Sequence, residues 1–144
     1  INKTALGQND ALKIFGDEYE TRDGSCIRDY IHVWDWAMGH VKDSENFGKA
    51  FASSEEPSNP YLVVNLWTGN GVTVKELETN FESVKSREVN KAEAEPRTGD
   101  MAGAYASSER AKNLIDWEAK YSIEDGIRDV FCWNEICETI LSYN

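Results

Sequence analysis

Long hydrophobic runs are missing from this sequence of 144 residues, and cysteine, proline and histidine are scarce. The longest apolar runs are a few residues, such as 61–64 (YLVV), whereas a membrane-spanning helix needs about 20 apolar residues. The start, INKTALGQND, lacks the basic stretch and apolar core of a secretory signal peptide. It also lacks an initial Met, which is compatible with an interior piece of a longer protein. The three cysteines (Cys26, Cys132 and Cys137) are too few for a disulfide framework, so we expect reduced thiols and a cytoplasmic protein.

Basic residues are also in short supply. The sequence has 15 Lys and Arg against 26 Asp and Glu, which gives a formal net charge of −11. Such a chain repels nucleic acid and anionic lipid, so we expect no nucleic acid and no membrane as a partner. A small polyanionic ligand would need a local basic site built against this field. His32 and His40 have no Cys or His at ligand spacing, so we expect no metal site.

The rest of the composition is that of a globular domain. Apolar residues make up 40% and charged residues 28% of the chain, and the length suits a single domain over residues 1–144. Apolar patterning predicts strands at 12–15, 27–33, 61–66 and 89–95, and helices at 35–51, 74–86, 107–114 and 123–141. Strands and helices alternate, which indicates an α/β fold. Because no complete run of βαβ units is present, the set looks like the second half of an α/β protein.

Capping residues mark where the predicted helices begin. Thr73 with Glu76, and Ser122 with Asp125, follow the Ser/Thr-x-x-acid pattern of a helix N-terminus. Asp35 is the expected N-cap of the helix over 35–51. The segment 53–60 (SSEEPSNP) carries two of the three prolines and is predicted to be a loop.

Three ordered blocks carry a resemblance to a known family. They are residues 15–40 (FGDEYETRDGSCIRDYIHVWDWAMGH), 65–77 (NLWTGNGVTVKEL) and 96–134, which begins PRTGDMAGAYASSERAKNLIDWEAKYS. In order and spacing they resemble the C-terminal portion of the UDP-glucose 4-epimerases, which are extended short-chain dehydrogenase/reductases. The resemblance covers nearly the whole chain. It implies an α/β substrate-binding portion of that fold without the N-terminal Rossmann half.

The resemblance also implies a binding site for the UDP part of a UDP-hexose. By position, Phe15 would lie beside the uridine, and Arg28 would pair with the diphosphate, with Tyr30 nearby. Arg97 would reach the phosphates, and Asp100 would accept hydrogen bonds from the ribose hydroxyls. Two guanidinium groups can neutralise a diphosphate through charge-assisted hydrogen bonds. A small side chain at Ala104, beside the expected hexose, resembles family members that also admit N-acetylated sugars.

The catalytic half of the family pattern is missing. The family binds NAD on a Gly-x-Gly-x-x-Gly turn after its first strand, but Gly69-Asn70-Gly71 is followed by Val72, Thr73 and Val74. The family also uses a Tyr-x-x-x-Lys pair, and none of the six tyrosines has a Lys four residues later. We therefore predict no catalytic and no cofactor-binding residues in this chain. NAD is implied only in a missing domain, supplied by the same gene product or by another protein chain.

Departures within the matched blocks keep other functions open. Trp67 and Pro96 replace a glycine and an arginine of the family pattern, Trp36 replaces a leucine, and the helix over 35–51 is unusually polar. The first hypothesis is the nucleotide-sugar-binding portion of an epimerase-like isomerase acting on UDP-glucose and UDP-galactose. The alternative is a divergent non-catalytic structural subunit of a larger assembly. A stand-alone nucleotide-sugar-binding module is a third possibility.

Overall fold

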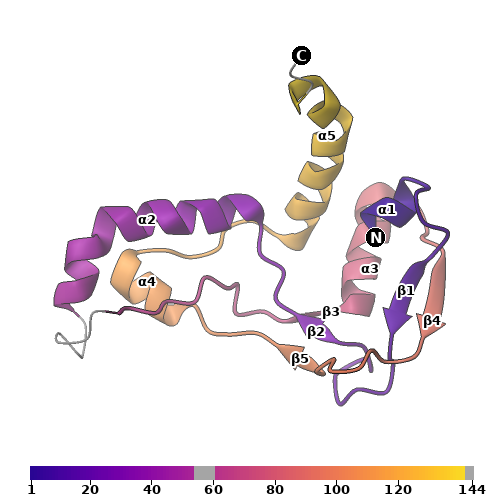
Figure 1. The fold of residues 1–144 in the computed structure, drawn as a ribbon, viewed down its shortest axis with the longest axis horizontal. Coiled ribbons are helices and arrows are strands. Elements are labelled where there is room, and N and C mark those ends of the chain that lie inside the picture. The colour runs from indigo at the N-terminus through magenta and orange to yellow at the C-terminus, as the bar shows by residue number, and fades with distance from the viewer. Residues whose placement is uncertain (54–60, 142–144) are drawn as a thin grey trace.

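The fold is an open α/β arrangement in which the helices are long and the strands are short. The computed structural model describes residues 1–53 and 61–141, so the predicted loop 53–60 lies outside them apart from Ser53. Figure 1 shows the long helix α2 and the short helix α4 at one end, and α1, α3, β1 and β4 at the other. The elements in chain order are α1 (Asn2–Ala5), β1 (Leu12–Phe15), β2 (Ile27–Arg28), α2 (Val33–Ala52), β3 (Val72–Thr73), α3 (Val74–Lys85), β4 (Lys91–Ala94), β5 (Gly103–Ala104), α4 (Glu109–Ile115) and α5 (Ile123–Leu141).

Two small sheets connect segments that are far apart in the sequence. β1 pairs in parallel with β4, from Leu12 opposite Lys91 to Phe15 opposite Ala94. In the second sheet, β2 lies between β3, which is antiparallel to it, and β5, which is parallel. That register sets Arg28 opposite Ala104. The sheets therefore bring together residues from both the first and the third block of the sequence.

Two hydrophobic clusters stabilise the two ends. Ala50 on α2 packs with Ala111, Ile115 and Trp117 of the α4 region. At the other end, Phe81 on α3 packs with Val89, Ile127 and Phe131, and the Phe81 and Phe131 rings lie 5.7 Å apart. Burial of a large apolar side chain contributes about 1.5–3 kcal/mol. The two aromatic rings therefore tie α5 to α3.

The predicted helix starts at Thr73 and Ser122 are confirmed. The Thr73 hydroxyl accepts a hydrogen bond from Glu76 N at 3.0 Å, and the Glu76 carboxylate accepts one from Thr73 N at 2.9 Å. Ser122 and Asp125 exchange the same pair, at 3.1 and 3.0 Å. The side chains satisfy backbone N–H groups that have no partner inside the helix. The predicted strands 12–15 and 89–95 and helix 107–114 also lie where β1, β4 and α4 are found.

The expected N-cap at Asp35 is wrong. His32 is the N-cap of α2, and its Nδ1 accepts a hydrogen bond from Trp34 N at 3.1 Å. Asp35 lies inside the first turn and is 3% exposed. Its carboxylate accepts hydrogen bonds from the backbone N–H groups of Lys120 and Tyr121 at 3.0 and 2.9 Å. Asp35 thus ties α2 to the connection between α4 and α5.

Two of the predicted strands are not found as predicted: one is much shorter, and the other is not a strand. The strand predicted over 27–33 is limited to Ile27–Arg28, because α2 already begins at Val33. The segment 61–66 belongs to no strand or helix within the described part of the chain. Its alternate side chains Leu62, Val64 and Leu66 pack against the Ala50 cluster. Val63, by contrast, is 69% exposed, so the segment has apolar side chains on both faces.

Candidate functional site

Two arginines converge on one carboxylate at the junction of the two sheets. Arg97 donates two hydrogen bonds to Asp100, at 2.8 Å from Nε and 3.2 Å from a terminal nitrogen. The guanidinium of Arg28 lies 3.8 Å from the same carboxylate. The Asp100 side chain is 15% exposed, whereas those of Arg28 and Arg97 are 37% and 59% exposed. The arginines therefore present cationic groups to solvent in a chain of net charge −11.

Backbone groups of the neighbouring strands and turn hold the side chains of Arg28, Arg97 and Asp100 in place. Arg28 also donates to the carbonyls of Ile27 and Met101, at 2.7 and 3.3 Å. β5 approaches β2 closely, and a Cβ on Gly103 would lie 2.6 Å from the Cβ of Ile27. Only glycine permits that approach without displacement. Asp100 N donates to the carbonyl of Arg97 at 3.0 Å, so a tight turn holds the ion pair.

Phe15 completes the cluster from the end of β1. The Arg97 guanidinium lies over its ring, 4.6 Å from the ring centre. Such a cation–π contact contributes about 0.5–1 kcal/mol at an exposed site. The structure therefore places Phe15, Arg28, Arg97 and Asp100 together, with Ala104 beside them through its pairing with Arg28. We call these five residues the arginine cluster.

Tyr19 and Cys26 lie next to the arginine cluster, and sequence reasoning did not single them out for this site. The Tyr19 hydroxyl is buried and has no hydrogen-bond partner within the described part of the chain. Burial, followed by the neighbouring Cys26 thiol, raises the pKa of Tyr19. Asp100 also raises the pKa of Tyr19, whereas Arg97 lowers it. The phenol therefore remains neutral beside the charged groups. In the sequence, only the position of Tyr19 in the first matched block could have indicated that it lies beside the arginine cluster.

Asp29 is a second residue missed by sequence reasoning. Its carboxylate accepts hydrogen bonds from the backbone N–H groups of Thr68 and Gly69, both at 3.1 Å, and from the Thr68 hydroxyl. These bonds hold the glycine-bearing loop 67–72 against the residue that follows Arg28. The N–H groups of Thr68 and Gly69 are consequently already satisfied. These two N–H groups are therefore not free to bind another acceptor unless Asp29 moves.

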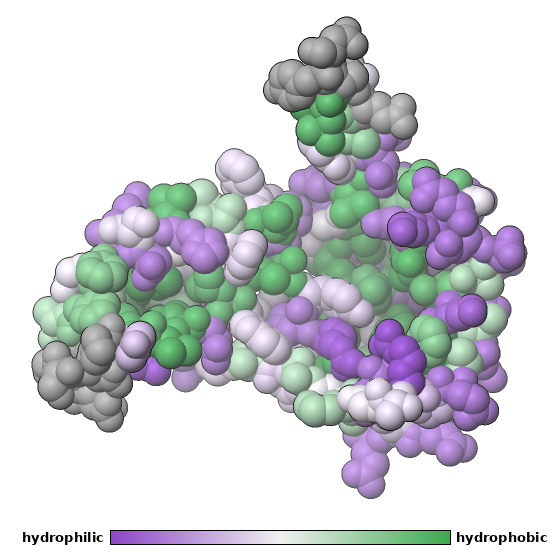
Figure 2. All heavy atoms as spheres, in the orientation of Figure 1, coloured by the Kyte–Doolittle hydropathy of each residue, from purple (hydrophilic) through white to green (hydrophobic). Residues whose placement is uncertain are grey.

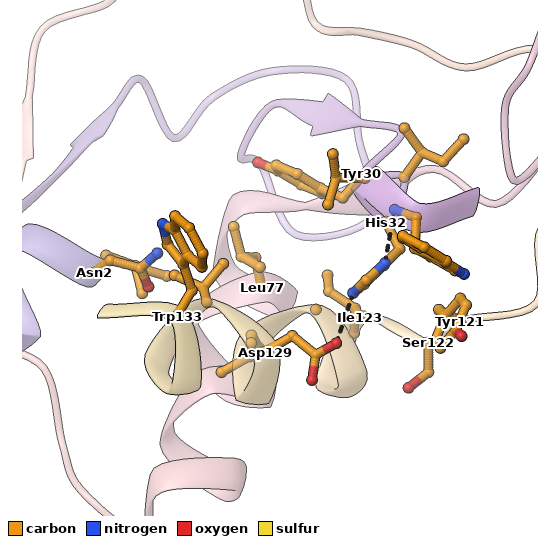
Figure 3. A pocket seen from close by; sticks show the side chains of 16 residues that line it. Asn2, Tyr30, His32, Leu77, Tyr121, Ser122, Ile123, Asp129 and Trp133 are labelled. Atoms are coloured by element: carbon orange, nitrogen blue, oxygen red, sulfur yellow. Dashed lines mark hydrogen bonds and ion pairs between the residues drawn. The ribbon is translucent and has the colours of Figure 1, made fainter. Parts of the chain in front are cut away.

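Tyr30 lies near enough to Arg28 for that positive charge to act on its phenol. Its ring lines an apolar groove of about 850 Å³ between α5 and the start of α2. Figure 3 shows Tyr30 and Trp133 around this groove, with His32 between Tyr121 and Asp129. His32 Nε2 lies 3.3 Å from the Asp129 carboxylate, and the His32 ring stacks on Tyr121 at 4.6 Å. Burial raises the pKa of Tyr30, although Arg28 acts in the opposite direction.

The chemistry available in the arginine cluster is that of binding. Guanidinium groups recognise phosphate oxygens, a carboxylate accepts hydrogen bonds from hydroxyl groups, and an aromatic ring stacks on a flat partner. Among the described residues, no group of three or more His, Cys, Asp or Glu side chains could hold a metal ion. None of the helices in residues 1–53 and 61–141 has the length and apolar character needed to cross a membrane.

Comparison with known proteins shows that the chain is similar to part of several nucleotide-sugar enzymes. The family model described as GDP-mannose 4,6 dehydratase matches residues 1–130. UDP-glucose 4-epimerase 2 of Arabidopsis thaliana is 37% identical over 133 residues, which is 92% of this chain and 36% of that protein. A UDP-glucose 4-epimerase of Halalkalibacterium halodurans is 39% identical over 136 residues, or 94% of this chain and 38% of that protein. This chain thus spans little more than a third of the length of these relatives.

Solved structures agree with the sequence matches. The UDP-glucose 4-epimerase of Stenotrophomonas maltophila, with bound NAD and formylated UDP-arabinopyranose, superposes with a TM-score of 0.83 at 31% identity. The match covers 97% of this chain and 39% of that one. The enzyme from Bifidobacterium longum in complex with NAD+ and UDP gives a TM-score of 0.80 at 32% identity, over 92% and 37% of the two chains. The α/β fold of this chain is that of the C-terminal portion of such enzymes.

Proposed function

Because this chain belongs to the GDP-mannose 4,6 dehydratase family and resembles the C-terminal portion of UDP-glucose 4-epimerases, we propose that it is the nucleotide-sugar-binding portion of an epimerase-like isomerase. Residues 1–144 form one substrate-binding domain in this proposal. The substrate is a UDP-hexose, with UDP-glucose and UDP-galactose as the interconverted pair. The domain does not catalyse the reaction alone.

The observation that carries the proposal is the convergence of Arg28 and Arg97 on Asp100. In the absence of ligand, Asp100 pairs with both guanidinium groups, at 3.8 and 2.8 Å, and the three side chains keep a net charge of +1. An incoming diphosphate offers each arginine new charge-assisted hydrogen bonds, which releases the carboxylate to accept hydrogen bonds from the ribose hydroxyls. One local rearrangement thus exchanges an internal ion pair for ligand contacts. The cost is small because exposed ion pairs contribute about 0–1 kcal/mol.

The remaining proposed residues determine what lies on either side of the diphosphate. Phe15, held under Arg97, provides a flat apolar surface beside the uridine. Ala104, on the neighbouring strand, leaves room for the hexose and for a substituent on it. Tyr30 is the residue least supported as a ligand contact, since its ring lines the groove between α2 and α5. Its contribution would come from the side of the groove that faces Arg28.

NAD belongs to a part of the enzyme outside this chain in our proposal. When bound there, NAD supplies reversible hydride acceptance at the hexose. The residues present here do not fit that cofactor, because the glycine-bearing loop 67–72 is already tied to Asp29. The segment 61–66, apolar on both faces, is where we expect the missing domain to attach. A strand buried on both faces is typical of a parallel sheet covered by helices.

Isothermal titration with UDP tests the nucleotide-binding proposal. We expect UDP to bind and uridine to bind at least about tenfold more weakly, because only UDP engages the arginines. Arg97→Ala and Arg28→Ala should each lower the affinity for UDP by a similar factor. Arg110→Ala on α4 is the matched control, since Arg110 is exposed and lies outside the arginine cluster. Equal affinities for UDP in all three variants would refute the proposed roles.

A non-catalytic structural subunit is the second candidate function. It is favoured by the exposed apolar side chains at the start of α2, where Val33, Trp34 and Trp36 are 72%, 58% and 52% exposed. Such a patch is typical of a surface that contacts another protein. If the folded chain gives no heat with millimolar UDP, the result would favour a structural subunit. It would exclude both the nucleotide-sugar-binding portion of an isomerase and a stand-alone nucleotide-sugar-binding module.

A further inference from the structure

Each of the two ring nitrogens of His32 has a partner, and the two partners lie on different helices. Nδ1 accepts a hydrogen bond from the backbone N–H of Trp34 at 3.1 Å, which makes His32 the N-cap of α2. Nε2 lies 3.3 Å from the carboxylate of Asp129 on α5. Figure 3 shows both interactions as dashed lines. His32 therefore joins the first turn of α2 to α5.

The imidazole ring of His32 is enclosed at this junction. Its side chain is 7% exposed, and the ring stacks on Tyr121 with an angle of 25° between the two planes. Gly126 of α5 lies against the ring edge, since a Cβ on Gly126 would be 3.5 Å from His32 Cδ2. In Figure 2 apolar residues cover the surface from the start of α2 toward α5. The ring is thus held in one orientation by contacts from several segments.

The two partners of His32 require one protonation state. A backbone N–H can donate only to an imidazole nitrogen that carries no proton, so Nδ1 is unprotonated and Nε2 carries the hydrogen that faces Asp129. In the imidazolium both nitrogens are donors, and the N–H of Trp34 then has no acceptor at this position. A positive charge at a helix N-terminus is also opposed by the helix dipole. Only the neutral Nε2–H tautomer satisfies both bonds.

The charges around His32 oppose one another. The titratable groups on the surrounding elements are Tyr30, Asp35, Tyr121, Asp129 and the terminal amine of Ile1. Asp35 directs its carboxylate to the backbone N–H groups of residues 120 and 121. Asp129 favours the imidazolium, but its side chain is 62% exposed, so solvent screens the attraction. A proton on Nδ1 therefore removes the cap of α2 outright and gains a weak ion pair in return.

We propose that His32 is a pH-sensitive joint between α2 and α5. In its neutral form His32 caps α2 and donates to Asp129. At mildly acidic pH a proton binds Nδ1, the N–H of Trp34 is released, and the first turn of α2 loosens while the contact with Asp129 remains. Histidine side chains commonly change charge between about pH 5 and 8. This joint does not depend on nucleotide binding by the arginine cluster.

Nitrogen-15 NMR of the full chain tests the protonation state and its effect on the helix. At pH 7.5 we expect His32 as the Nε2–H tautomer, and His40, the other histidine of the chain and an exposed one, is the internal reference. Between pH 7.5 and 5.5 the protection of the Trp34 amide against hydrogen exchange should fall about fivefold or more, after correction for the intrinsic exchange rate, because the N-cap is lost. An Nδ1–H tautomer at pH 7.5 would overturn the proposal. So would constant protection of Trp34 while His32 takes up its proton.

Matched variants assign the response to His32. Asn caps helices but does not titrate in this range, so His32→Asn should protect the Trp34 amide equally at both pH values, whereas His40→Asn should keep the wild-type response. An equal response in wild type and His32→Asn would contradict the proposal.

A second pair of variants tests the contact with α5. Asp129→Asn keeps an acceptor for Nε2 but removes the charge, so the midpoint of the Trp34 response should move about 0.2–0.7 pH units lower. Glu135→Gln makes the same change in net charge at another exposed position of α5 and should leave the midpoint unchanged. Equal midpoints in Asp129→Asn and Glu135→Gln would exclude α5 as the other side of the joint.

Discussion

Replacing Asp100 with Asn should strengthen binding of inorganic pyrophosphate. The substitution preserves shape but removes the carboxylate charge that holds Arg97 at 2.8 Å and Arg28 at 3.8 Å. Each arginine is more than one-third exposed, so each ion pair is discounted to about 0.5–1 kcal/mol. Freeing both arginines therefore lowers the free energy of anion binding by about 1–2 kcal/mol, or about 5- to 30-fold in affinity.

Titration of wild-type and Asp100→Asn chains with pyrophosphate, UDP and uridine separates the two roles of this carboxylate. Pyrophosphate should bind more tightly to the variant, and uridine more weakly, because the acceptor for the ribose hydroxyls is lost. The gain with UDP should lie below the gain with pyrophosphate. Asp43→Asn, on the exposed face of α2, makes the same change in net charge and should leave all three affinities unchanged. Unchanged or weaker pyrophosphate binding in Asp100→Asn would refute the reasoning.

Three further predictions concern stability. Asp35→Ala should lower the free energy of unfolding by about 3–5 kcal/mol in urea denaturation, because it removes a buried charged acceptor that two part-buried backbone N–H groups share; a loss below about 1 kcal/mol would contradict this. The hydrogen bond from Arg22 lowers the pKa of Glu76 in the folded chain. The ionised carboxylate therefore stabilises the fold at pH values above its ordinary pKa. This contribution is lost as the pH falls through the lowered pKa of the folded state. Urea midpoints measured from pH 6 to about pH 3 should therefore fall less steeply in Glu76→Gln than in wild type, and parallel curves would exclude the effect. Gly103→Ala should cost about 1–3 kcal/mol by thermal denaturation, since its Cβ meets Ile27, and wild-type stability would show that β5 can shift freely.

Much of the fold could be predicted because the relevant signals are local. The pairs Thr73 with Glu76 and Ser122 with Asp125 lie three residues apart, and both helices begin where these pairs predict. By contrast, His32 and not Asp35 is the N-cap of α2, because the Asp35 carboxylate makes its hydrogen bonds outside the helix. Its carboxylate bonds to residues 120 and 121, a long-range contact that no local pattern reveals.

The sheets and the site were predictable to different degrees. Segment 61–66 has the composition of a buried strand, but strand formation needs a neighbouring edge, and none pairs with it among the described residues. The residues of the arginine cluster came from the resemblance, and the structure places five of the six predicted site residues together. Tyr30 differs because it lines the groove, although the charge of Arg28 still acts on its phenol. Asp29 and Tyr19 gave no separate signal, since their roles depend on contacts formed only in the folded chain.

The parallel pairing of β1 with β4 has a consequence for the order of folding. Leu12 and Lys91 are neighbours in the sheet but 79 positions apart in the sequence. Closing such a long loop costs chain entropy before any contact repays it, and proteins rich in distant contacts fold slowly. During synthesis, Phe15 would leave the ribosome long before Ala94, its strand partner, or Arg97, which packs on its ring. The side of the molecule that carries the arginine cluster should therefore acquire protection against hydrogen exchange after α2 and α3 have formed.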